Sequence, residues 1–78
     1  MKTMKELIKE ADKKGYDVII ATADGFSIWK SFCDDDWVSM VDECCVMCRY
    51  TDEEIEAMEV VSYDWGDTDG CLFIDAAE

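Results

Sequence analysis

Histidine and proline are absent from the sequence, and cationic side chains are few: seven Lys and Arg stand against twenty Asp and Glu, a net charge of −13 at pH 7. Without histidine the chain cannot form a Ser-His or Cys-His relay or a His-ligated zinc site. A chain of 78 residues also leaves little concavity for a substrate. We therefore expect a binding protein and not an enzyme. The shortage of Lys and Arg argues against direct binding to nucleic acid or to an anionic membrane surface.

Long apolar runs are also missing. Residues 1–14 are charged and lack the apolar run of a secretory signal, and no stretch has the length of a membrane span. We expect a cytoplasmic protein that makes no contact with a membrane. The five cysteines are an odd number in a chain with no export signal, which predicts reduced thiols and no disulfide framework.

The cysteines nevertheless raise the question of a metal site. Cys45 and Cys48 form a Cys-x-x-Cys pair beside Cys44, and Cys33 and Cys71 are available to complete a four-thiolate zinc or iron–sulfur centre. The pair falls inside a segment that we expect to be helical, so core packing is the favoured interpretation. We expect no cofactor, and a cysteine-ligated metal-binding regulatory module is the alternative hypothesis.

The first segment predicts an amphipathic helix over residues 3–14, because its apolar side chains recur at spacings of three, four and seven. Thr3 and Glu6 have the spacing of a capping box, and Gly15 supplies a C-terminal stop. This pattern indicates one helix with its apolar face against a core.

Residues 16–23 and 26–33 are rich in β-branched and aromatic side chains and flank an Asp-Gly pair, which predicts a β-hairpin with a two-residue turn. In that register Ile19 and Ile28 share one face, and Ile20 lies on the other. Neither face is cleanly polar. Either both faces are covered, or one is an exposed apolar patch for self-association or for a protein partner.

Residues 34–49 predict a second helix. Three consecutive aspartates precede it as cap and first-turn carboxylates, and several side chains fall on one helical stripe: Trp37, Met40, Val41, Cys44 and Cys48. A further capping box, Thr51 with Glu54, predicts a short helical turn.

Residues 60–65 and 71–75 predict a second hairpin across a turn rich in Asp and Gly. The element order helix, hairpin, helix, hairpin over residues 1–78 predicts a single small α+β domain. We expect a four-stranded antiparallel sheet with the helices mainly on one face.

Charge is distributed unevenly along the chain. Residues 1–14 carry five lysines and three acids, a net charge of +2, which leaves −15 for residues 15–78. From residue 31 onward Arg49 is the single cation against fifteen acids. Like charges at this density disfavour the compact state, so we expect the chain to use their field. Our first hypothesis is that the carboxylates imitate nucleic-acid phosphates and occupy the basic groove of a nucleic-acid-binding protein.

The candidate partner-binding residues are the acids in the densest parts of this region: Asp34, Asp35, Asp36, Asp42, Glu43, Asp52, Glu53, Glu54, Glu56, Asp64, Asp67 and Asp69. Two other interpretations remain open beside phosphate mimicry. The acidity can serve solubility alone, as on many small domains. In that case the chain is a homo-oligomeric interaction domain, and we expect a homodimer that buries the second apolar face of the first hairpin.

One segment resembles a known family. Its residues Leu7, Ile8, Glu10, Lys14, Tyr16 and Val18 stand at the same relative spacing as at the start of one of the small phage-encoded anti-CRISPR proteins that inhibit the type II guide-RNA nuclease. The resemblance implies a compact, acidic α+β inhibitor, encoded by a phage and present in the host cytoplasm. Such an inhibitor occupies the site where the nuclease reads duplex DNA with Arg and Lys.

Overall fold

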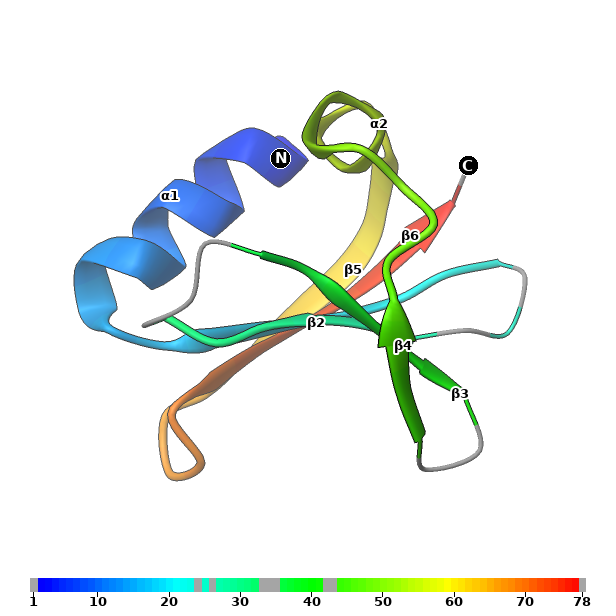
Figure 1. The fold of residues 1–78 in the computed structure, drawn as a ribbon. Helices are drawn as coiled ribbons and strands as arrows, with labels where there is room; N and C mark the ends of the chain where they lie inside the picture. The colour runs from blue at the N-terminus through cyan, green and yellow to red at the C-terminus, as the bar shows by residue number, and fades with distance from the viewer. Residues whose placement is uncertain (1, 24, 26, 33–35, 42–43, 78) are drawn as a thin grey trace.

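The computed structural model describes residues 2–23, 25, 27–32, 36–41 and 44–77. The elements follow in the order α1 (Met4–Lys14), β1 (Asp17–Ala21), β2 (Ser27–Lys30), β3 (Val38–Val41), β4 (Cys44–Met47), α2 (Asp52–Glu56), β5 (Glu59–Gly66) and β6 (Cys71–Ala77). The expected α+β class is confirmed. The expected four-stranded antiparallel sheet is wrong, because the six strands form one mixed sheet in the order β4-β3-β2-β1-β6-β5 (Figure 1).

Helix α1 forms as its sequence predicts. The Thr3 hydroxyl accepts a hydrogen bond from the Glu6 N–H while the Glu6 side chain accepts one from the Thr3 N–H, which completes the capping box. Gly15 ends the helix with φ of +73°, a left-handed conformation that favours glycine. The buried side chains Met4 and Leu7 lie on the face toward the sheet.

The first hairpin forms, but in a different register from the expected one. Ile20 pairs with Ile28 and Ile19 pairs with Trp29, so Ile28 shares a face with Ile20 and not with Ile19. The physical reason is the turn: the Gly25 N–H donates to the Thr22 carbonyl oxygen at 3.2 Å, which closes a turn one residue earlier than an Asp-Gly centre would. A shift of one residue exchanges the faces of one strand relative to the other.

The predicted helix over residues 34–49 is wrong, and the segment contains the antiparallel hairpin β3–β4 instead. The apolar residues of this segment do recur at the spacing of a helix. However, Val, Cys and Trp are weak helix formers, and the segment contains several of them. Strand β3 also completes hydrogen bonds along the side of β2, where Trp29 pairs with Val38. Tertiary pairing therefore overrides the apparent period.

The second half follows the prediction more closely. Thr51 and Glu54 form the second capping box, and α2 is a short helix over Asp52–Glu56. Strands β5 and β6 form the expected hairpin, with a bulge between Val60 and Ser62. The unexpected contact is between hairpins, since β6 lies parallel to β1 and joins the two halves of the sheet.

Both helices lie on one face of the sheet, as Figure 1 shows, so the expectation that the helices cover mainly one face is confirmed. The core between them consists of buried side chains from both helices and from the covered face: Met4, Leu7, Ala11, Val18, Ile20, Ile28, Ile55, Met58, Val60, Leu72, Ile74 and Ala76. We call the opposite side of the sheet the open face. In the described part of the chain, neither helix has the length and apolarity to cross a membrane.

Candidate functional site

A groove with a volume of about 680 Å³ lies between the β3–β4 end of the sheet and α2, beside several of the nominated acids. We call it the α2 groove. It is lined by Asp36, Trp37, Val38, Met47, Cys48, Tyr50, Thr51, Asp52 and Glu53. The capping box of Thr51 fixes the start of α2, and with it the position of the first-turn carboxylates. The groove therefore has three carboxylates beside two aromatic rings.

The carboxylates of the α2 groove come from two separate segments, because Asp36 precedes β3 while Asp52 and Glu53 begin α2. All three are exposed. An ion pair joins Lys2 to Glu10, far from this groove in the sequence. Lys30 lies on one aromatic wall, with its Nζ 5.9 Å from the centroid of the Trp37 ring.

The other nominated acids are not brought into this groove. Glu54 takes part in the α2 capping box, and Glu56 lies exposed on the same helix. Asp64, Asp67 and Asp69 lie at or beside the β5–β6 turn, at the opposite end of the molecule from α2 (Figure 1). The remaining four nominated residues lie outside the described part of the chain: Asp34, Asp35, Asp42 and Glu43.

Asp67 has a structural role that the sequence did not indicate. Its Oδ1 accepts a hydrogen bond from the Tyr16 hydroxyl at 2.8 Å, and this bond raises the pKa of Tyr16. The Tyr16 ring also packs edge-on against Trp65, with 6.0 Å between ring centroids. Lys14 lies over the Trp65 ring, with its Nζ 3.9 Å from the centroid. The β5–β6 turn is thus tied to the C-terminal end of α1.

Positive charge is concentrated on α1, which lies over the covered face of the sheet (Figure 1). The lysines of its last turn, Lys13 and Lys14, complement the helix dipole. The α2 groove lies at the other helix, whose first turn is entirely acidic and whose last turn has no basic residue. The two helices on this face therefore differ in charge, with lysines in the last turn of α1 and acids in the first turn of α2.

A four-thiolate metal site that joins Cys71 to Cys48 does not fit the fold. Cys48 follows β4 and Cys71 begins β6, and three strands lie between β4 and β6 in the sheet. At about 4.8 Å per strand, four steps separate them by roughly 19 Å. Within the described residues no group of three or more His, Cys, Asp or Glu side chains is placed to hold a metal ion. Cys33 lies outside the described residues.

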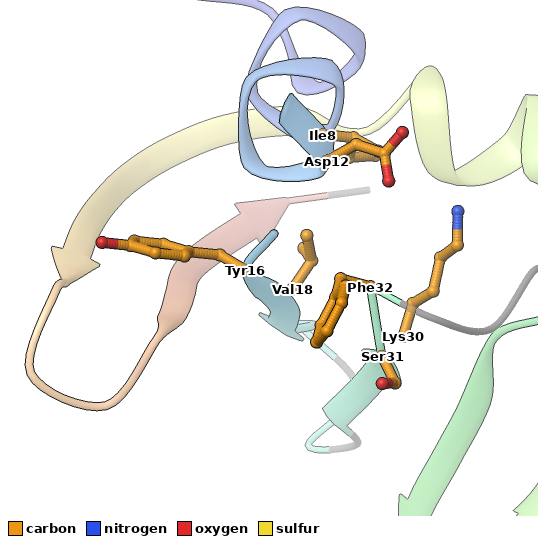
Figure 2. Close-up of a pocket in the computed structure, with 7 residues that line it drawn as sticks. All are labelled: Ile8, Asp12, Tyr16, Val18, Lys30, Ser31 and Phe32. Atoms are coloured by element: carbon orange, nitrogen blue, oxygen red, sulfur yellow. The ribbon is translucent and has the colours of Figure 1, made fainter. Parts of the chain in front are cut away.

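A smaller hollow lies where α1 meets the ends of β1 and β2, and Figure 2 shows its lining. Asp12 from the helix and Lys30 from β2 point to the same side, while Tyr16 points away from the hollow. Its volume of about 10 Å³ is enough for one water molecule at most. It is a packing defect and not a ligand site.

The open face carries a feature that sequence reasoning located only as an undecided apolar face. Five apolar side chains stand opposite one another across five strands and form what we call the apolar row: Met47, Val38, Trp29, Ile19 and Phe73. The alternation in β6, with Leu72 and Ile74 inward and Phe73 and Asp75 outward, was the available sequence signal.

The chain matches no known family model, and no curated protein and no solved structure is significantly similar to it.

Proposed function

We propose that this protein is an acidic inhibitor that binds a nucleic-acid-binding protein of a host defence system, such as an RNA-guided nuclease, and occupies its DNA-binding groove by phosphate mimicry. The observation that carries the proposal is the α2 groove. Carboxylates from two segments line it, and Trp37 and Tyr50 form part of its walls. The resemblance of residues 7–18 to phage-encoded inhibitors supports the same class of partner.

This combination of groups suits the side chains with which proteins hold DNA. Arg and Lys bind phosphate through charge-assisted hydrogen bonds, and a carboxylate accepts the same bonds. Aromatic rings add cation–π attraction for the same cations. The net charge of −13 adds a long-range field that steers the protein toward a basic groove and away from nucleic acid itself.

Competition with DNA tests the proposal. A panel of RNA-guided nucleases and other DNA-binding proteins is mixed with a fluorescent duplex, and the anisotropy of the duplex is followed as this protein is added. We expect displacement of the duplex from at least one nuclease, and displacement that weakens by tenfold or more between about 50 and 300 mM salt. Failure to displace DNA from any member of the panel at low salt refutes the proposal.

Two variants with the same loss of charge show whether the α2 groove is responsible. The first combines Asp36→Asn, Asp52→Asn and Glu53→Gln, which line the groove. The control combines Asp12→Asn, Asp67→Asn and Asp69→Asn, which do not. We expect at least tenfold weaker displacement for the first variant and less than about threefold for the control, because contact charges outweigh remote ones at physiological ionic strength. Equal losses would assign the effect to net charge alone.

A further inference from the structure

We propose that the open face is a second contact surface for the same cationic partner, and that a hollow at its β5 end receives an arginine side chain. The inference rests on the proposed function only in requiring a cationic protein partner. Its surface is separate from the acids of α2. It assigns a role to the apolar row and to Asp64 and Asp75, which the α2 groove leaves unexplained.

Two members of the apolar row are exposed, and the other three, Ile19, Trp29 and Val38, are half-buried. Each member stands directly opposite the next, so the row runs without interruption from β4 to β6. Met47 is 89% exposed and Phe73 is 38% exposed. Both helices lie on the other side of the sheet (Figure 1). Contiguous apolar surface of this kind marks a protein interaction site more often than a free surface.

The hollow adjoins the row at the β1–β6–β5 end and has a volume of about 210 Å³. We call it the edge hollow. It is lined by Ile19, Ala21, Ser62, Tyr63, Asp64, Phe73, Ile74 and Asp75. Asp64 stands opposite Phe73 in the sheet, and Ser62 stands opposite Asp75. The Ser62 hydroxyl donates a hydrogen bond to Asp75 Oδ2 at 2.9 Å, which holds that carboxylate beside the hollow.

Gly66 positions the aromatic wall of the edge hollow. A Cβ atom at residue 66 would lie 2.7 Å from Phe73 Cε2, so the ring occupies the space that glycine leaves free. The ring is thereby placed over the β5 backbone near Asp64, its cross-strand neighbour. An aromatic face and two carboxylates therefore border one small apolar hollow.

The size and chemistry of the edge hollow point to one side chain as its occupant. Its volume is below the roughly 300–1,000 Å³ of pockets for small molecules. An arginine places its apolar stem on Ile19 and Ala21, stacks its planar guanidinium on Phe73, and donates paired hydrogen bonds to a carboxylate. Lys and Arg are absent from the described strand positions of the open face.

Continuity favours the partner of the α2 groove over a second copy of the chain. Val38 and Met47 line the α2 groove and also begin the apolar row, so one partner surface can cover both. Each copy of this chain carries a net charge of −13, so face-to-face pairing of two copies meets strong repulsion. A cationic partner gains attraction on the same surface.

The test is an NMR titration of the isotope-labelled protein with the capped peptide acetyl-Leu-Arg-Leu-amide. A matched peptide replaces arginine with citrulline, which has the same shape and no charge. We expect saturable shifts at Ile19, Phe73 and Asp75 with the arginine peptide, and at least fivefold weaker binding of the citrulline peptide. The double variant Asp64→Asn, Asp75→Asn should bind the arginine peptide more weakly by a similar factor. The control double variant Asp67→Asn, Asp69→Asn should bind it as wild type does.

Each other outcome overturns the inference and is separable from the proposed function. If chemical shifts change only at the α2 groove, the edge hollow is not the arginine site, and the DNA competition result still stands. If both peptides bind equally well, the edge hollow does not recognise the charge of arginine. Concentration-dependent shifts along the apolar row without peptide, together with a dimer in sedimentation, assign the open face to a second copy. No shift at the edge hollow in the folded wild-type protein also refutes the inference, whatever the competition assay gives.

Discussion

The substitution Ile20→Ala should destabilise the protein strongly, while the same change at the neighbouring Ile19 should not. Ile20 is fully buried at the centre of the sheet, and its loss removes three carbon atoms from the core. At about 0.8 kcal/mol per buried CH₂ the transfer contribution is about 2.4 kcal/mol, and the cavity left behind raises the loss to about 3–4 kcal/mol. Ile19 points to the open face, and its loss should cost about 1 kcal/mol or less.

The measurement is urea unfolding followed by the fluorescence of the three tryptophans. A domain of 78 residues has a total stability of about 4–12 kcal/mol, so Ile20→Ala should lower the midpoint severely with an unchanged slope. Its melting temperature should fall by roughly 12–30 °C. If Ile19→Ala is as damaging as Ile20→Ala, then β1 presents the opposite face to the core and the register Ile20 with Ile28 is wrong.

Three further results are expected. Thr51→Ala should lose about 1 kcal/mol of stability by urea unfolding because it removes the α2 cap, whereas Glu54→Gln should lose little because glutamine completes the same capping box. The ion pair with Lys2 lowers the pKa of Glu10 in the folded protein. The ion pair therefore stabilises the fold above the ordinary glutamate pKa of about 4.3, and this stabilisation is lost as pH falls through the lower pKa of the folded protein. The urea unfolding midpoints of wild type and Glu10→Gln should converge as pH falls through this window. Burial, with the nearby charges of Asp17 and Asp69, raises the pKa of Cys71, so iodoacetamide should label that thiol more slowly in the folded protein than in urea at pH 8, as mass spectrometry of its peptide would show; equal rates would contradict this.

The elements with local signals could be predicted from the sequence. The two capping boxes, the stop at Gly15 and the β5–β6 hairpin depend on residues within a few positions of one another, and all are confirmed. The helix prediction for residues 34–49 was wrong because the spacing of their apolar residues fits a helix while their composition favours strands. The decision depended on the free side of β2, a partner that the segment's own residues do not reveal.

The site was predictable in kind but not in position. The excess of carboxylates after residue 31 is visible in the sequence, and the acids at Asp36 and Asp52 were both nominated. Their approach across the sheet end depends on the β3–β4 hairpin, which the helix prediction had removed. The edge hollow was missed for a related reason, since Asp64 and Asp75 border it together only in the register that pairs Asp64 with Phe73 and Ser62 with Asp75.

The parallel pairing of β1 with β6 has a consequence for how the chain folds. Asp17 pairs with Cys71, so residues 54 positions apart in the sequence are neighbours in the sheet. Strand β6 also lies between β1 and β5, so Ile20 and Leu72 cannot be buried together until β6 has paired with β1. We therefore expect folding to be slow relative to a helical bundle of this length, and abolished when β6 is removed.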